Sequence, residues 1–143
     1  MSETLKVQKF EVDAILPTKG RPGDAGWDIS SYEDITIPPN SWKLVRTGIG
    51  LTVPVGTYGR IAPRSGLSTK GIMVNAGVVD RTYRGEIRCI LVNVSAENSY
   101  EVKKNDRIAQ LILEKIVEDC VIEEVEMLED TCRGDQGFGS TGV

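Results

Sequence analysis

The alternation of apolar and polar side chains predicts β-strands along most of the chain. Between residues 5 and 16, apolar positions alternate with mostly polar ones, at Phe10, Val12, Ala14 and Leu16, which is the period of a half-buried strand. Further strands are predicted from short apolar runs bounded by turn residues, at 34–38, 42–53, 58–62, 72–80, 86–94 and 107–113. Glycines at 48 and 50 indicate a bend or bulge. Since these runs lack helical periodicity, the pattern predicts an all-β fold, either a sandwich or a barrel.

Two stretches depart from this regular pattern. Residues 63–71 are rich in small and hydroxyl side chains, which suits one short helical turn with free N–H groups at its start. Residues 117–130 carry apolar side chains at a helical spacing together with many glutamates. We predict a strand at 117–130, because its neighbours are β and short apolar runs do not separate the two possibilities.

The C-terminal residues do not have the composition of a core. Residues 133–143 hold four glycines and no aliphatic side chain before Val143. The sequence therefore predicts one β domain over 1–132 and a flexible arm over 133–143. The arm's arginine, aromatic and hydroxyl side chains suit a lid over a phosphate-bearing ligand. Simple terminal disorder is the alternative.

Composition adds limits on size, location and partners. The 143 residues, 40% hydrophobic and 27% charged, suit a single water-soluble domain without a membrane span. The N-terminus lacks the apolar block of a signal peptide, so we expect an intracellular protein, cytoplasmic or nuclear. A net charge of −4 argues against a nucleic-acid polymer as partner, although a small phosphate ligand remains possible. Three widely spaced cysteines are interpreted as free thiols.

The chain contains no histidine. This excludes the usual general base, the common nucleophilic triads and most zinc sites. Any acid–base chemistry must therefore fall to a carboxylate, a lysine or a tyrosine.

The stretch from Gly77 to Glu86 is the first candidate for chemistry. An apolar run leads into Asp80, Tyr83 follows three residues later, and a second apolar segment resumes after Arg84-Gly85. A strand, a loop and a second strand place Asp80 and Tyr83 at the mouth of a hairpin, where a rigid sheet can hold reactive groups. A plain turn, with Tyr83 packed on its neighbours, is the alternative.

Three other stretches carry candidate polar side chains, of which those at the helical turn suit an anionic ligand. Asp28 follows Gly26, a residue that permits close backbone approach. Arg64 and Ser65 lie at the predicted helical turn. Gln110 interrupts an otherwise apolar strand, and a buried polar group needs a specific partner. Ordinary caps and turns are the alternatives for the first two loops.

Together, the loops at 24–30, 63–71, 77–86, 105–110 and 133–141 resemble the five ordered motifs of the trimeric dUTPase family. The resemblance covers the chain from about Pro17 to its end. It implies a distorted β jelly roll with one short helix. It also implies hydrolysis of dUTP to dUMP and pyrophosphate with Mg²⁺, which keeps dUTP low and supplies dUMP, in a homotrimer whose active sites are each shared by three subunits.

The same resemblance assigns roles to individual residues. Asp80 resembles the general base for the water that attacks the α-phosphorus, and Tyr83 the residue that packs on the deoxyribose. Asp28 resembles the acid of the metal-water network, with Mg²⁺ held mainly by the triphosphate, and Asp106 supports the site. The implied substrate-binding set comprises Arg64, Ser65, Gly66, Asn75, Gly77, Val79, Tyr83, Gln110, Arg133, Phe138, Gly139, Ser140 and Thr141.

Elementary chemistry agrees with these roles. Phosphoryl transfer needs mostly positioning and charge neutralisation, with one base near the water. In a chain without histidine, an aspartate is the natural base. Mg²⁺ prefers oxygen ligands and keeps several waters, so a triphosphate can hold it without a dedicated protein cage.

Three features depart from the family pattern. Thr82 stands where an aspartate is common, Asn105 replaces a common glycine, and the loop between Leu67 and Gly77 is one residue shorter than in many relatives. Asparagine tolerates a positive φ, so the turn at Asn105 can survive.

Two other functions remain open from the sequence. The dCTP deaminase branch shares the fold and uses a glutamate near the hairpin, where this chain reads GVVDRTYRGE. A non-catalytic jelly-roll binding or shell protein is the second alternative. The presence of Asp80 in so short a chain favours the hydrolase.

Overall fold

The computed structural model describes residues 3–140 and Gly142. Within these residues the chain forms eleven strands and one short helix. The elements are β1 (Lys6–Lys9), β2 (Trp27–Ser30), β3 (Ile35–Ile37), β4 (Ser41–Arg46), β5 (Ile49–Thr52), β6 (Thr57–Ala62), α1 (Ser65–Ser68), β7 (Ile72–Asn75), β8 (Val78–Val79), β9 (Arg88–Asn93), β10 (Tyr100–Val102) and β11 (Arg107–Lys115). The fold is all-β, as predicted, and the short helix falls inside the predicted stretch 63–71.

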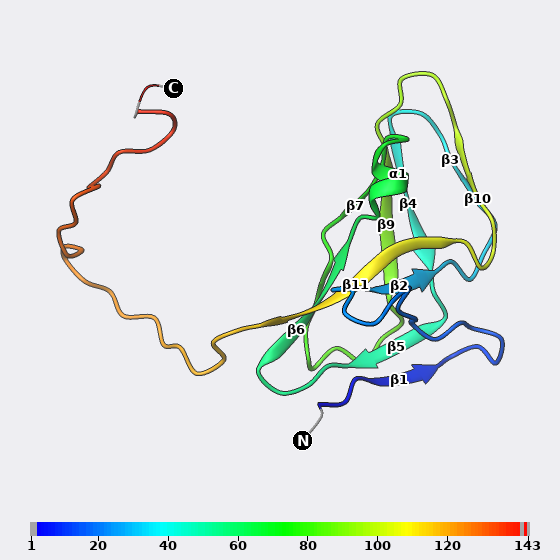
Figure 1. The fold of residues 1–143 in the computed structure, drawn as a ribbon, viewed down its shortest axis with the longest axis horizontal. Coiled ribbons are helices and arrows are strands. Elements are labelled where there is room, and N and C mark those ends of the chain that lie inside the picture. The colour runs from blue at the N-terminus through cyan, green and yellow to red at the C-terminus, as the bar shows by residue number, and fades with distance from the viewer. Residues whose placement is uncertain (1–2, 141, 143) are drawn as a thin grey trace.

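Antiparallel pairing joins the strands into four small sheets (Figure 1). The largest has the order β2-β11-β6-β8, and a second has the order β4-β9-β7. Two ribbons, β1-β5 and β10-β3, complete the body. Most neighbouring strands are far apart in sequence, which is typical of a distorted jelly roll.

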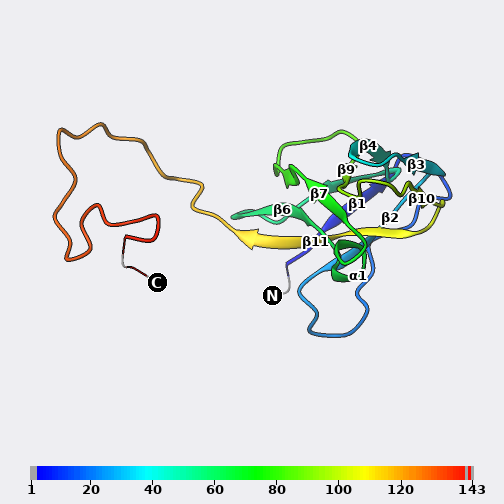
Figure 2. The same ribbon diagram turned by 90° about the horizontal axis from the view of Figure 1, so that it is seen from above.

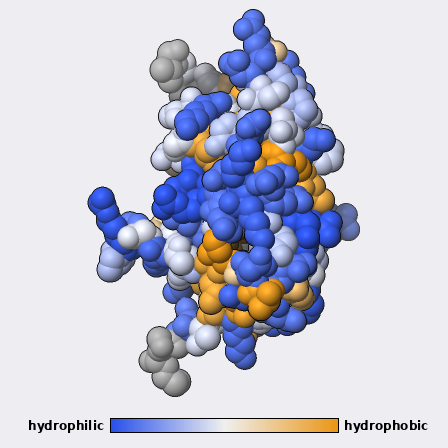
Figure 3. Space-filling model, turned by 90° about the vertical axis from the view of Figure 1, so that its right-hand side faces the viewer, coloured by the Kyte–Doolittle hydropathy of each residue, from blue (hydrophilic) through white to orange (hydrophobic). Residues whose placement is uncertain are grey.

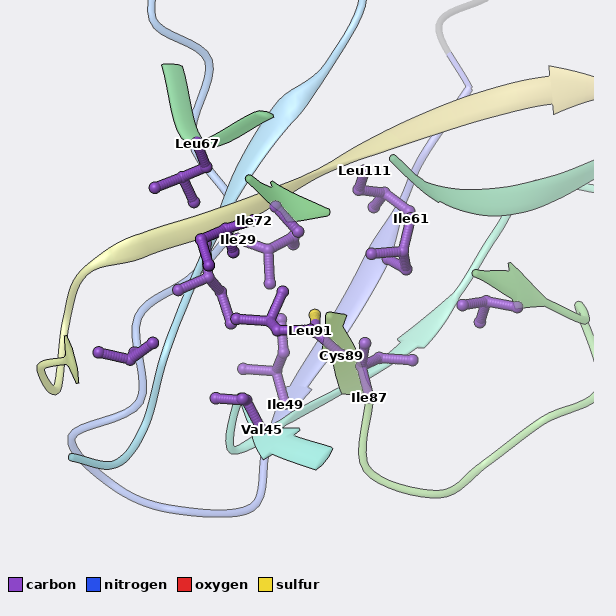
Figure 4. Packing of buried hydrophobic residues seen from close by; sticks show 14 of the residues in the cluster. Ile29, Val45, Ile49, Ile61, Leu67, Ile72, Ile87, Cys89, Leu91 and Leu111 are labelled. Atoms are coloured by element: carbon purple, nitrogen blue, oxygen red, sulfur yellow. The ribbon is translucent and has the colours of Figure 1, made fainter. Parts of the chain in front are cut away.

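One hydrophobic core lies between these sheets. Its fully buried side chains come from several strands and include Ile29, Ile49, Ile72, Leu91 and Leu111 (Figure 4). Cys89 lies among them, and burial raises the pKa of its thiol to about 12. On the surface, the face in Figure 3 is mostly hydrophilic with separate apolar areas.

The first predicted strand is much shorter than the alternation suggested. Only Lys6–Lys9 forms β1, which pairs with β5. Residues 10–16 form turns in which Ala14 is buried while Val12 is 93% exposed. Tyr32 donates a 2.7 Å hydrogen bond to Asp13, and Lys104 donates one of 2.6 Å to the same carboxylate. The alternating residues 10–16 therefore form a loop that tertiary contacts hold in place, and the strand prediction was wrong beyond residue 9.

The predicted strand at 72–80 is divided into β7 and β8. Ala76 and Gly77 adopt positive φ angles of 58° and 94°, a conformation that interrupts an extended strand. As a result β7 pairs with β9, whereas β8 pairs with β6 in the other sheet. The bend indicated by the glycines in 42–53 is confirmed, since Gly48 has a φ of 73° between β4 and β5.

The chain leaves the body after β11 (Figures 1 and 2). The strand predicted at 117–130 does not form, and all its residues are exposed. No strand pairs with this segment in the described chain. Without packing against a neighbouring element, an apolar period alone does not stabilise a helix or a strand. The boundary between a domain at 1–132 and an arm at 133–143 stays a prediction.

Two short strands were missed. β2 lies in a stretch interpreted as a loop, and β10 occupies three residues between the strands predicted at 86–94 and 107–113. Both are defined by their partners: β2 pairs with β11, and β10 pairs with β3. Such short segments carry too little periodicity to be recognised alone.

Candidate active site

Asp80 and Tyr83 lie on a loop between two sheets. The loop, residues 80–87, connects β8 to β9. These two strands do not pair with each other, because β8 pairs with β6 and β9 with β4 and β7. The predicted hairpin is therefore a crossover, although Tyr83 N does close a turn on the Asp80 carbonyl at 3.1 Å.

A pocket of about 370 Å³ opens beside this loop. It is lined by residues that the sequence had assigned to substrate binding together with apolar side chains of β4, β6 and β9. The lining residues that were predicted are Asn75, Gly77, Val79, Asp80 and Tyr83. Those that sequence reasoning missed include Leu44, Ile61 and Ile90. In the sequence they are ordinary strand positions, and only the packing of two sheets brings them to the pocket.

Gly77 shapes one wall of the pocket. Its φ of 94° lies in the region that glycine favours. A Cβ at this position would overlap the carbonyl oxygen of Ile61. Instead, Ile61 N donates a 2.7 Å hydrogen bond to the Gly77 carbonyl. The backbone at residue 77 is thus held against β6.

Tyr83 is held by its own loop. Its hydroxyl donates a 3.0 Å hydrogen bond to the Glu86 carbonyl. A Cβ at Gly85 would overlap that hydroxyl, so the phenol ring lies directly against the Gly85 backbone. The side chain remains 47% exposed. One side of Tyr83 is therefore fixed, and part of it remains available to a ligand.

Arg81 connects the loop to the chain beyond β11. Its Nε donates a 3.0 Å hydrogen bond to Glu118 Oε1, and this bond is the main cause of a lowered pKa for the Glu118 carboxyl. Arg84 also donates to the Arg81 carbonyl at 2.7 Å. Glu118 is a contact that sequence reasoning missed, since it is 37 residues away from Arg81.

A second group of predicted residues gathers around Asp28. The Arg64 guanidinium lies 3.2 Å from one oxygen of this carboxylate, and that of Arg107 lies 3.7 Å from the other. Arg64 Nη1 also donates a 3.0 Å hydrogen bond to the Arg107 carbonyl. Asp28 is opposite Gln110 in the pairing of β2 with β11. The register of these strands brings the first, second and fourth predicted loops together.

Gln110 has a defined partner, as expected for a polar group in an apolar strand. Its Nε2 donates a 2.8 Å hydrogen bond to the Pro63 carbonyl, just before Arg64. A Cβ at Gly26 would overlap the Gln110 Oε1. Gly26 is therefore required for close packing on the Gln110 amide.

The helical turn and the Asp106 turn flank this cluster. Ser65 and Gly66 begin α1 and are both exposed. Asp106 accepts a 2.9 Å hydrogen bond from Lys103 N and stabilises the turn before β11. Asn105, which stands where glycine is common in the family, adopts a positive φ of 75°, as expected for this turn. A pocket of about 440 Å³ lies here, lined by Arg64, Leu67, Lys70, Tyr100, Asn105, Asp106 and Arg107.

The two pockets have no lining residue in common. Asp80 and Tyr83 line the first, whereas Arg64 and Asp106 line the second. Thus the structure brings the predicted residues together in two separate groups.

The predicted residues of the arm lie away from both pockets. Among the described residues, no hydrogen bond joins 119–140 to the strands. Arg133 Nε donates to the Gln136 carbonyl at 2.8 Å, and Ser140 N donates to the Gly137 carbonyl at 3.0 Å. Phe138 is fully exposed, with a φ of 54°. Thr141 lies outside the described residues.

Metal binding by the protein alone is not supported by the arrangement of acids. Within residues 3–140 and Gly142, no group of three or more acidic or cysteine side chains is placed to hold a metal ion. The Asp28 carboxylate is already occupied by two guanidinium groups. In the same part of the chain, no helix has the length and apolar character needed to cross a membrane.

Comparison with known proteins gives consistent matches over almost the whole chain. The profile of the family described as dUTPase matches residues 12–142. The deoxyuridine 5'-triphosphate nucleotidohydrolase of Saccharomyces cerevisiae is 55% identical over 141 residues, which is 98% of this chain and 95% of the yeast protein.

Solved structures of dUTPases have a similar fold. A dUTPase of Staphylococcus bacteriophage 80alpha with dUPNHPP has a TM-score of 0.92 at 28% identity, covering 99% of this chain and 100% of the phage chain. A mutant dUTPase of the S. aureus phage phi11, described with a structural Mg(II) ion, has a TM-score of 0.82 at 24% identity, covering 89% of this chain and 99% of the phage chain.

Proposed function

The chain belongs to the dUTPase family, and from this premise we propose how its residues hydrolyse dUTP to dUMP and pyrophosphate. The observation that carries the proposal is the pocket at the 80–87 loop, where the exposed Asp80 carboxylate, the Tyr83 phenol ring and the backbone at Gly77 meet. In the proposal these groups activate the attacking water, contact the deoxyribose and read the edge of the uracil ring.

Asp80 is proposed as the general base. It lines the pocket, is exposed to water, and lies in a histidine-free chain. A carboxylate in this position orients a water molecule and accepts its proton as the water attacks the α-phosphorus. The phosphorus–oxygen bond to pyrophosphate then breaks, and the two electrons of that bond leave with the pyrophosphate. A positioned base of this kind contributes about 10²–10⁴-fold to the rate.

The nucleoside is proposed to bind between Tyr83 and the strand that precedes Asp80. Backbone groups from Asn75 to Val79 read the uracil edge, because Gly77 keeps the chain close to β6 while its neighbours face the pocket. The Tyr83 ring packs on the deoxyribose and leaves no room for a 2′-hydroxyl. A rigid ring suits this role, since its position is set by Gly85 and by the Glu86 carbonyl.

Phosphate binding is assigned to the cluster around Asp28. Arg64 and Gln110 supply donors, and Ser65 with Gly66 adds a hydroxyl and backbone N–H groups at the start of α1. The Asp28 carboxylate orients Arg64 through their 3.2 Å contact. Preorganised donors of this kind neutralise charge without rearrangement during the reaction. Asp106 supports the cluster by fixing the turn that leads into β11.

We propose a homotrimer in which each active site is shared by subunits. We call the pocket at Asp80 and Tyr83 the nucleoside pocket, and the residues around Asp28 and Arg64, with the pocket at Arg64 and Asp106, the phosphate cluster. The support is that these two pockets have no lining residue in common within one chain. The outer face of β4-β9-β7 also carries exposed apolar side chains, including Trp42 at 60% and Met73 at 40%. Residues 117–128 expose further apolar side chains, such as Ile122. A subunit interface would bury both surfaces.

The arm is proposed to close over the bound nucleotide. Arg133 and Ser140 would contact the outer phosphates together with Gly139 and Thr141, and Phe138 would cover the uracil ring. In support, the Arg133 and Phe138 side chains make no contact with the strands that would have to break. Closure of such a segment excludes water from the reacting groups.

Mg²⁺ is proposed as the cofactor, held mainly by the triphosphate. The fit follows from the donors present: Asp28 is paired with two arginines, so it would reach the ion only through water. When bound, the ion supplies charge neutralisation to the phosphate oxygens. The chain's own residues orient the triphosphate for that arrangement.

A single assay tests the proposed function. The purified protein is incubated with dUTP, dCTP, dTTP or UTP in the presence of Mg²⁺, and pyrophosphate and ammonia are measured. We expect pyrophosphate from dUTP far in excess of the other three. Ammonia from dCTP would instead indicate a deaminase, and no product from any nucleotide would support a binding or shell protein.

A further inference from the structure

Glu86 is the least exposed carboxylate near the nucleoside pocket, and sequence reasoning assigned it no role in the hydrolysis. Its side chain is 12% exposed. Both carboxylate oxygens accept hydrogen bonds from Arg46 Nε, at 3.1 and 3.2 Å, and Oε2 also accepts one of 2.9 Å from Gly48 N. A charge with so little exposure persists only when it is paired and hydrogen-bonded, and here both conditions are met.

These contacts fasten the end of the 80–87 loop to the bend between β4 and β5. Next to Glu86, Ile87 N donates a 2.8 Å hydrogen bond to the Ile49 carbonyl. The buried Thr47 hydroxyl donates one of 2.5 Å to the Ile87 carbonyl. Residues 86 and 87 are thus fixed by one side chain and by two main-chain anchors.

The position of Tyr83 depends on this fastened end. The Tyr83 hydroxyl bonds the carbonyl of Glu86, and its ring lies against the adjacent Gly85. The rest of the loop has only one main-chain hydrogen bond of its own, from Tyr83 N to the Asp80 carbonyl. Any shift of the Glu86 backbone would therefore move the phenol ring.

We propose that Glu86, clamped by Arg46 and Gly48, is the positioning residue that holds Tyr83 against the sugar and so sets the discrimination between deoxyribo- and ribonucleotides. This inference rests on the proposed function, in which Tyr83 contacts the sugar. It gives the Glu86 carboxylate a role through Tyr83, because its oxygens are already occupied by Arg46 and Gly48 and do not need a substrate partner.

The test measures kcat/KM for dUTP and for UTP and compares their ratio among folded variants. In Glu86→Gln and in Arg46→Met, the ratio should fall by about tenfold, since misplacement of a contacting group by an ångström alters rates by one to two orders of magnitude. Arg46 does not line the pocket. An effect of Arg46→Met therefore separates positioning from direct contact between Glu86 and the nucleotide.

Glu114→Gln is the matched control. Glu114 also pairs with an arginine, Arg60 at 3.2 Å, and accepts a hydrogen bond from a tyrosine, Tyr58 at 2.7 Å, but it lies on β11 and does not line the nucleoside pocket. This variant should keep the wild-type ratio. Arg46→Lys retains a positive charge beside Glu86 and should keep a larger ratio than Arg46→Met.

An unchanged ratio in folded Glu86→Gln or Arg46→Met, whatever the change in melting temperature, would overturn the inference and leave Glu86 a purely structural residue. If these variants do not fold, Glu86→Asp replaces them, because its shorter side chain cannot reach Arg46 and Gly48 together. An unchanged ratio in Glu86→Asp would overturn the inference equally. A wild-type protein that does not hydrolyse dUTP would instead refute the proposed function.

Discussion

At the scale of single residues, the chemistry proposed for the pocket beside the 80–87 loop depends on side chains that are conspicuous in the sequence and on neighbours that are not. Asp80 and Tyr83 were recognisable as an acid and an aromatic in a histidine-free chain. The contacts that orient them were not, because Gly85 and Glu86 act through backbone geometry and through Arg46, which is 40 residues away from Glu86. A residue type indicates which chemistry is available, whereas the partners of a residue depend on the fold.

The role of Asp80 can be tested by removing only its charge. Asp80→Asn should lower the turnover of dUTP by about 10²-fold or more, because the amide cannot accept a proton from water. Binding of a non-hydrolysable dUTP analogue, measured by calorimetry, should change little, since the side chain keeps its size. Retained turnover would show that another group is the base.

The three cysteines should differ sharply in reactivity. Cys89 is buried and the pKa of its thiol is raised to about 12, so almost no thiolate forms at neutral pH, whereas Cys120 and Cys132 are exposed. Titration of the native protein with a thiol reagent should therefore modify Cys132, which lies outside the proposed subunit interface, quickly, and Cys89 only after denaturation. Fast modification of Cys89 in the native state would contradict its place in the core.

At the scale of elements, the available pairing partners decide whether a segment with an alternating or apolar pattern forms a strand. Residues 72–80 looked like one strand, yet Ala76 and Gly77 divide them between two sheets, and this division forms a wall of the pocket. The alternating residues 10–16 and the apolar residues of 117–130 pair with no strand in the described chain and stay outside the sheets. Alternation of apolar and polar side chains shows that a segment is suited to a half-buried strand. It does not show that a neighbouring strand is present to pair with it.

The contact between Arg81 and Glu118 fixes where the C-terminal segment leaves the body. Glu118→Gln should lower kcat/KM for dUTP by about two- to fivefold, the scale of an exposed ion pair, because the arm then starts from a less defined position. Glu129→Gln, at an exposed acid beyond residues 117–128, serves as the control and should have no effect. Equal activities of Glu118→Gln and the wild type would remove this contact from the mechanism.

The same contact predicts a pH dependence. Since the hydrogen bond from Arg81 lowers the pKa of Glu118, the ion pair is present above the ordinary pKa of a glutamate and is lost as the pH falls through the lowered value. The difference in kcat/KM between wild type and Glu118→Gln should therefore persist at neutral pH and shrink in acid. A difference that grows in acid would contradict this sign.

At the scale of the whole molecule, the residues of the candidate active site form two separate groups within one chain. The nucleoside pocket and the phosphate cluster are lined by different residues, and the described residues of the arm line neither. Exposed apolar side chains on β4-β9-β7 and on 117–128 are consistent with surfaces that another subunit covers. Function therefore has to be tested on assembled protein.

Mixing two inactive variants tests whether sites are shared. Asp80→Asn and Arg64→Ala chains, unfolded and refolded together in equal amounts, should regain about a quarter of wild-type activity if each site takes these residues from different subunits. Asp80→Asn mixed with the double variant Asp80→Asn/Arg64→Ala is the control and should stay inactive. No recovery in the first mixture would place both residues of a site on one chain.

Removal of residues 133–143 tests the arm. The shortened protein should keep its circular dichroism spectrum and melting temperature, because the described residues of this segment add nothing to the core. Its turnover of dUTP should fall strongly, since no lid would exclude water or contact the outer phosphates. Undiminished turnover would show that the arm has no catalytic role.

The sequence alone determined the class of the fold, the absence of histidine chemistry and the order of the loops that carry polar side chains. These properties are local, because they depend on which residue types follow one another. Only the tertiary structure decided which strands pair, and hence that Asp28, Arg64 and Gln110 form one cluster while Asp80 and Tyr83 form another. It also revealed the contacts of Glu86 and Glu118. Such long-range contacts depend on the packing of sheets in space, which leaves no regular pattern along the chain.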